Sequence, residues 1–214
     1  AYHEWHLLFD KLLRSLEQEV LLPKLETLVA GLVQAAHAQT AAVAGQPVED
    51  AASRVEQLFQ VAAAELGLPV TLGPLAQEEK DLIDAHSAAD ERSPLSGGKL
   101  DYSLFTPRGH YTRNADLKRY FVAMSVLGQS AFCLPGTIDC PGVEPARLAI
   151  LASRALAGSP RLVALWRELY EPTAFLVGLA DDYTPLEVAA AARASAPSGL
   201  EDATVFADDA AVSG

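Results

Sequence analysis

Residues 5–36 read WHLLFDKLLRSLEQEVLLPKLETLVAGLVQAA, and apolar side chains recur in this stretch every three or four positions. That spacing gathers the apolar residues on one face of an α-helix. Pro23 interrupts the pattern as a proline in the first turn of a helix would. The stretch therefore predicts one helix before Pro23, a second helix after it, and a fold in which helices share an apolar interior.

The same spacing recurs through most of the remaining chain. Thr184-Pro185-Leu186-Glu187 has the residues of a capping box with proline at the first helical position, so a helix is expected to start there and to reach about Arg193. From Glu91 to Arg113 serine, proline and glycine replace the pattern, which predicts a long irregular loop. Further helices are expected over residues 48–62, 76–90, 117–127, 144–157 and 160–172.

These elements predict an all-α fold, a packed array of about seven to nine mostly antiparallel helices with one long irregular loop. The chain has 214 residues and half of them are hydrophobic, enough for a sizeable core. We expect a single helical domain over residues 1–194, as a fragment of a larger one. Residues 195–214 contain four acids and no Lys or Arg, which predicts an acidic tail or linker.

The formal net charge of −12 argues against nucleic-acid binding and against docking on anionic lipid. No stretch of the sequence has the roughly 18 apolar residues of a transmembrane helix. Glycine-rich phosphate loops, dinucleotide fingerprints and nucleophile elbows are also missing from the sequence. We therefore expect no cofactor and favour a non-catalytic protein, although a pair of catalytic carboxylates needs no local motif.

Two cysteines, Cys133 and Cys140, enclose the turn-forming residues Leu134-Pro135-Gly136-Thr137-Ile138-Asp139. We expect them to form a disulfide, which would stabilise the fold by roughly 2–3 kcal/mol and place the protein outside the cytoplasm. A zinc site is an alternative, but the spacing is not that of a zinc motif and no histidine lies nearby in the sequence. Two separate thiols are the plainest alternative.

Arg108, His110, Tyr111 and Arg113 stand just before a predicted helix start and are the candidate ligand-binding residues. Two guanidinium groups and free backbone N–H groups can hold an anion such as a phosphate or carboxylate. In the plainer interpretation the arginines pair with structural carboxylates, Tyr111 fills the core and His110 bonds to the loop backbone.

Asp181 and Asp182 precede another helix start and, with Glu171 and His110, are the weak candidates for catalytic groups. The two aspartates can also ligate calcium, although the sequence lacks the alternating ligand pattern of a calcium loop. Simple helix capping is the interpretation we favour. His3 and His6 are one helical turn apart, but they do not form a metalloprotease motif, so we expect no metal site.

Three stretches resemble a bacterial domain-of-unknown-function family, DUF 3160. They are DYSLFTPRGHYTR at 101–113 followed by LKRYF at 117–121, YEPTAFLVG at 170–178 with DDYTP at 181–185, and AYH at 1–3 with LLFD at 7–10. Members of that family are typically longer and often look exported, so the resemblance implies a fragment, cut inside the family's domain at both ends. It implies no activity, and the Cys133–Cys140 loop is not part of it.

Two hypotheses for function follow. The first, which we favour, is an extracytoplasmic helical module that acts as a binding, scaffold or accessory subunit. Trp5, Leu8 and Phe9 begin a helix with no preceding layer to cover them, so the partner is expected to be the rest of the same polypeptide or another protein subunit. The second is a hydrolase-like enzyme, possibly glycan-directed, which requires Glu171, Asp181, Asp182 and His110 to share a helical cleft.

Overall fold

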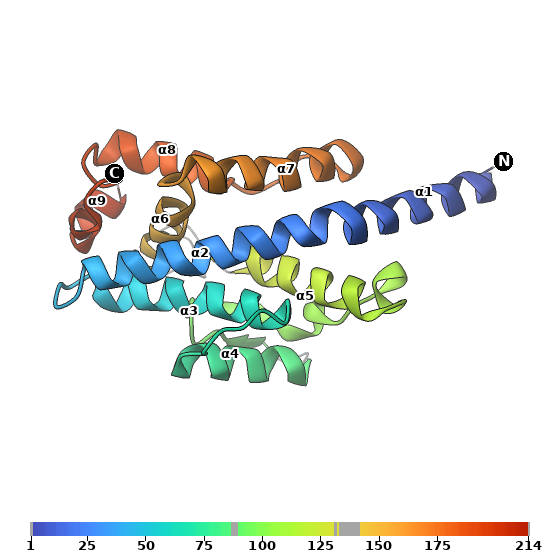
Figure 1. The fold of residues 1–214 in the computed structure, drawn as a ribbon. Helices are drawn as coiled ribbons and strands as arrows, with labels where there is room; N and C mark the ends of the chain where they lie inside the picture. The colour runs from blue at the N-terminus through green and yellow to red at the C-terminus, as the bar shows by residue number, and fades with distance from the viewer. Residues whose placement is uncertain (1, 87–89, 131, 133–141, 214) are drawn as a thin grey trace.

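The computed structural model describes residues 2–86, 90–130, 132 and 142–213, leaving out the side chains of Tyr2 and Asp90. The fold of these residues is all-α except for a two-stranded hairpin (Figure 1). Cys133 and Cys140 lie outside the described residues, so the disulfide stays a prediction. The described helices are α1 (Tyr2–Leu16), α2 (Leu22–Ala42), α3 (Glu49–Glu65), α4 (Pro74–Ala85), α5 (Ala115–Gln129), α6 (Glu144–Ala157), α7 (Pro160–Val177), α8 (Pro185–Ser195) and α9 (Asp209–Ser213).

Helices α2 and α3 lie side by side at the centre of the molecule. Helices α4, α5 and α6 pack on α3, whereas α7 packs on α2 and α8 on α6 (Figure 1). Leu25 and Val29 of α2 and Val55 and Ala62 of α3 are fully or almost fully buried. Their spacings of four and seven positions are those of the predicted apolar faces, so the prediction of packed helices is confirmed.

The predicted break at Pro23 takes a different form in the structure. Residues 2–42 are helical throughout, with a π-helical turn, η1 (Glu17–Leu21), between α1 and α2. Proline has no N–H to donate to the carbonyl four residues before it, and its ring crowds that carbonyl. The wider π turn ends at Leu21, two positions before the proline, and Pro23 then lies in the first turn of α2, where a helix tolerates it.

The predicted irregular loop is largely ordered. Its residues form strands β1 (Asp90–Arg92) and β2 (Lys99–Asp101), which pair antiparallel, and the 3-10 turns η2 (Tyr102–Phe105) and η3 (Gly109–Thr112). Gly97, with a φ of 72°, makes the tight connection between the strands possible. The helix expected over residues 76–90 ends at Ala85, so the strand β1 was missed by the sequence pattern.

The C-terminal segment differs from the expected acidic tail. Residues 196–213 fold back as a 3-10 turn, η4 (Ala203–Ala207), followed by α9. Phe206 is fully buried and belongs to the main core together with Ala196 and Ala203. The segment packs on the protein although it has no basic residues of its own. Its apolar side chains lie in the core, and two arginines of α6 donate hydrogen bonds to its backbone carbonyls.

Candidate functional site

The π turn η1 carries a buried carboxylate. Glu17, its first residue, is only 6% exposed. Turns of this kind are rare and occur often at functional sites. A buried carboxylate also requires partners, because it has lost its water.

Both partners of Glu17 come from the turn η3, 93 and 94 positions along the chain. His110 Nε2 lies 2.6 Å from Oε2 of Glu17, and the Tyr111 hydroxyl donates to Oε1 at 2.8 Å. Gly109, with a φ of 57°, allows the tight turn that presents these two side chains in succession. The Tyr111 ring also contacts the His110 ring, with centroids 4.0 Å apart and the planes tilted by 37°, so ring contact as well as hydrogen bonds holds the cluster.

Asp10 extends this cluster along α1. Arg14 Nε donates to Oδ2 of Asp10 at 3.0 Å, and Arg113 Nη2 lies 3.7 Å from the same oxygen. His110 Nδ1 faces the other oxygen of Asp10 at 3.8 Å. His110 is therefore placed between the carboxylates of Asp10 and Glu17.

A groove of about 350 Å³ lies beside Glu17. Its walls come from the end of α1, the turns η1 and η3, and helices α5 and α7, and they are mainly apolar or aromatic. Burial, with the charge of Glu17, raises the pKa of Tyr120 on its α5 wall, so this phenol stays protonated. The lining residues are Leu13, Leu16, Glu17, Leu21, Tyr111, Tyr120, Phe121, Met124, Ser125, Gly128, Gln129, Thr173, Leu176 and Val177.

The predicted ligand-binding residues are only partly brought together. His110 and Tyr111 converge, but the anion that they bind is the protein's own Glu17. Arg108 is exposed and donates to the Ser103 carbonyl at 3.1 Å, and the side chain of Arg113 is 56% exposed. An external anion at the two arginines stays a prediction.

The weak catalytic candidates do not gather around His110. Glu171 is exposed on α7, and Asp181 and Asp182 are exposed in the connection to α8. Within the described residues, no hydrogen bond or ion pair joins any of the three to His110, and none of them lines the groove. His3 and His6 are exposed on α1, and in the described part of the chain no three His, Cys, Asp or Glu side chains could together hold a metal ion.

Glu17 was missed as a site residue because its partners lie far along the chain. One local signal was present: Leu13, Glu17 and Leu21 are spaced four apart, which puts an acid in the middle of an apolar stripe. A second signal was Pro23, six positions later, because a proline disturbs the regular backbone hydrogen bonds of the helical turn that precedes it.

A family model for a protein of unknown function, DUF3160, matches residues 1–213. The chain belongs to the DUF3160 family. The resemblance in the three sequence stretches is thereby confirmed, and membership carries no activity. No curated protein and no solved structure matches this DUF3160 chain.

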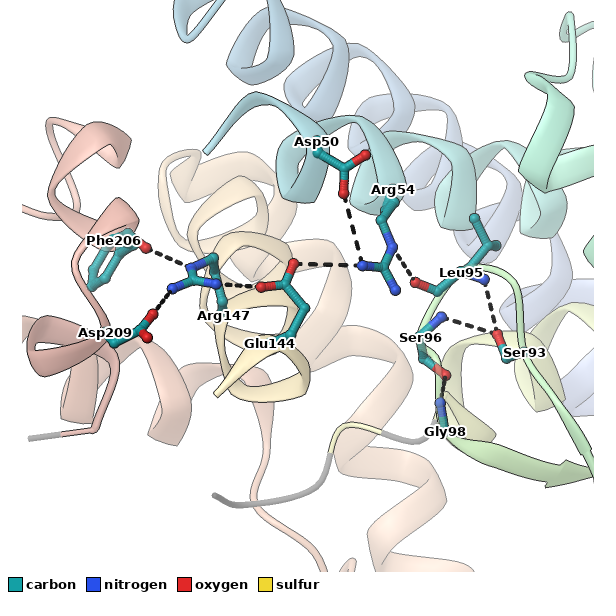
Figure 2. A network of polar contacts seen from close by, with 10 residues as sticks. All are labelled: Asp50, Arg54, Ser93, Leu95, Ser96, Gly98, Glu144, Arg147, Phe206 and Asp209. Atoms are coloured by element: carbon teal, nitrogen blue, oxygen red, sulfur yellow. Dashed lines mark hydrogen bonds and ion pairs between the residues drawn. The ribbon is translucent and has the colours of Figure 1, made fainter. Parts of the chain in front are cut away.

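A second polar cluster of the DUF3160 chain joins α3, the turn between the two strands, α6 and the C-terminal segment (Figure 2). Arg54 Nε donates to the Leu95 carbonyl at 2.7 Å, and its Nη1 lies 3.5 Å from Glu144. Arg147, one helical turn after Glu144, pairs with that carboxylate and with Asp209, and donates to the Phe206 carbonyl at 2.7 Å. Because each guanidinium binds carbonyls and carboxylates of other elements, this cluster connects α3, α6, the turn between the strands and the C-terminal segment.

Beside this cluster, the DUF3160 fold has a small, partly open pocket of about 20 Å³ between Arg54, Glu79 and the Ser93–Ser96 turn. That volume suits about one water molecule and excludes a larger ligand. Glu79 is buried there and accepts hydrogen bonds from Ser93 Oγ and from the Tyr102 hydroxyl, the latter at 2.8 Å. Burial raises the pKa of Glu79 despite these hydrogen bonds.

None of the described helices of this DUF3160 chain is by itself long and apolar enough to cross a membrane. Helices α6 and α7 meet that criterion only when they are taken together, and they are bent by 104° at the break between them.

Proposed function

We propose that this DUF3160 protein is a non-catalytic binding module, an accessory or scaffold subunit, that takes an amphipathic helix of a partner protein into the groove beside η1. The observation that carries this proposal is the groove of about 350 Å³ with apolar walls from α1, α5 and α7. An amphipathic helix buries its apolar face in such a groove and presents anchors at helical spacing.

Apolar side chains continue beyond the groove on two of its helices. Trp5 and Leu8 of α1 are 68% and 64% exposed, and Phe175 of α7 is 88% exposed. In Figure 1 the N-terminal part of α1 extends past the other helices. Proteins that act alone rarely leave large side chains of this kind uncovered in groups, and a bound helix would remove them from water.

The charge of the protein favours a basic partner. The chain has a formal net charge of −12 at pH 7. A partner helix with Lys or Arg on its polar face would be drawn to this surface, while its apolar face supplies the stabilising contacts.

The test is the binding of a fluorescent peptide of about 20 residues, with leucine on one helical face and alternating glutamine and lysine on the other. We expect saturable binding by fluorescence anisotropy at physiological salt. Val177→Asp places a carboxylate at the wall of the groove, so it should weaken binding by at least about tenfold. The matched control is Leu104→Asp, because Leu104 is 39% exposed and does not line the groove. Absence of saturable binding, or equal weakening by both substitutions, would overturn the proposal.

The extracytoplasmic location belongs to the same proposal and rests on the expected Cys133–Cys140 disulfide. Alkylation of the denatured, unreduced protein should label neither cysteine, whereas prior reduction should expose both. Labelling without reduction would remove the argument for this location. No observation supports the hydrolase-like alternative. Within the described residues, Glu171, Asp181 and Asp182 form no hydrogen bond or ion pair with His110.

A further inference from the structure

Glu17 is placed where it can select what enters the groove. Among the described residues that line the groove, Glu17 is the one with a formal charge at neutral pH. The nearby charges of Asp10, Arg14 and Arg113 lie outside the lining and pair with one another. The charged character of the lining therefore comes from a single carboxylate, which is hydrogen-bonded to Tyr111 and faces a ring nitrogen of His110.

The Glu17 carboxylate retains capacity for a further donor. Its Oε1 accepts one hydrogen bond from Tyr111, and its Oε2 faces one nitrogen of His110. An ionised carboxylate offers about four acceptor positions on its two oxygens, so about two remain. Tyr111 and His110 hold the group in place, and its orientation does not have to be fixed when a ligand binds.

A purely apolar occupant would be disfavoured by this arrangement. It would strip the remaining water from the carboxylate and give no donor in return, which is strongly unfavourable for a buried ion. A cation that reaches Glu17 replaces the hydrogen bonds that the carboxylate loses with its water. The groove should therefore bind a helix that carries such a cation more tightly than a purely apolar helix.

We infer that the groove recognises a lysine that the partner helix carries within its apolar face, with the ammonium group bound to Glu17. This inference rests on the proposed function, because it specifies the occupant of the same groove. Lysine fits the site because its four-carbon stem packs along apolar walls while the compact ammonium supplies three donors. The negative charge of the whole protein acts in the same direction but cannot distinguish where on the helix the lysine lies.

The experiment compares two peptides of identical composition and net charge. Both are amphipathic helices of about 20 residues. The first peptide has a lysine at the centre of its apolar face and a leucine on its polar face. In the second peptide these two residues are exchanged, so the leucine lies on the apolar face and the lysine on the polar face. We expect the wild-type protein to bind the first peptide at least about tenfold more tightly, since only this peptide places an ammonium at the carboxylate. Acetylation of the central lysine should abolish the preference, because it removes the charge and keeps the length.

The variant Glu17→Gln should bind both peptides with nearly equal affinity, while Asp116→Asn, an exposed acid of α5 that does not line the groove, should keep the wild-type preference. The comparison of peptides on the wild-type protein does not depend on how well Glu17→Gln folds. Saturable binding of both peptides with equal affinity would overturn the lysine inference and leave the proposed function standing. No saturable binding of either peptide would overturn both.

Discussion

Phe206 allows a direct test of how the C-terminal segment contributes to the fold. The side chain is fully buried in the main core, although it belongs to a segment whose composition suggests a solvated tail. Replacement of a fully buried phenylalanine by alanine typically lowers the free energy of unfolding by about 3–5 kcal/mol. We expect Phe206→Ala to fall in this range, because the neighbouring backbone is fixed by Arg147 and Arg154 and cannot easily close the cavity.

Gly199 makes the test sharper because it lies directly under the same ring. A Cβ atom at Gly199 would lie 2.6 Å from Cε2 of Phe206, well inside the contact distance of two carbon atoms. Gly199→Ala should therefore destabilise the wild-type protein by about 1–3 kcal/mol through overpacking. In the Phe206→Ala background the ring is gone, so most of this penalty should disappear. A carbonyl contact of 3.1 Å to Ala196 would leave a smaller remainder.

The measurement is urea denaturation of the two single variants and the double variant, followed by circular dichroism. We expect the double variant to be more stable than the sum of the single effects predicts, with a coupling of about 1–2 kcal/mol. Gly128→Ala is the control, because a Cβ there meets no atom within 4 Å and alanine favours the helix. If Phe206→Ala costs less than about 1 kcal/mol and the two substitutions are additive, the segment does not pack on the core as described.

Two further predictions concern buried charges. Burial raises the pKa of Glu79 above its ordinary value of 4.5, so the folded state holds this proton more tightly than the unfolded state does. The stability due to Glu79 is then present below pH 4.5 and is lost as the pH rises through the raised pKa. In urea denaturation, the free energy of unfolding of Glu79→Gln should therefore increase relative to that of the wild type as the pH rises through this range. A free-energy difference between the two proteins that does not change with pH would contradict the reasoning. Arg147→Met removes the donor to the Phe206 carbonyl and the partner of Asp209, so it should destabilise by about 1–3 kcal/mol and speed hydrogen exchange in residues 203–213. The exposed Arg161→Met should change neither quantity, and unaltered exchange in Arg147→Met would show that the segment is held by other contacts.

The helical part of the fold could be predicted because its information is local. Val55 and Ala62 are seven positions apart on one helix face, and both are buried as this spacing requires. The capping box at Thr184 and Glu187 was equally visible, since the residues that form it are three positions apart. At the start of α5, Asn114 is of a residue type that favours the N-cap position, and it accepts a hydrogen bond from Leu117 N at 2.9 Å.

The candidate site could not be predicted in the same way. The Glu17–His110 pair joins residues 93 positions apart, and no local pattern specifies which distant carboxylate faces a histidine. The packing of residues 196–213 also depends on distant groups, because Arg147 and Arg154 of α6 supply the cations that the segment lacks. Composition described these residues correctly as acidic, but it did not reveal that Phe206 occupies the core.

The turn η1 fixes the rotational phase between the two halves of the long N-terminal helix. Removing a single residue from positions 17–21 would return the backbone to an ordinary α-helical count. Each residue of an α-helix corresponds to about 100° of rotation about the helix axis. The deletion would therefore rotate α1 by roughly that angle about its own axis, while α2 kept its position in the core. Leu13 and Leu16, which line the groove, would then point elsewhere with no change in their identity. A one-codon deletion in this segment would thus redirect the groove-lining face of α1, which makes the length of the segment as consequential as its sequence.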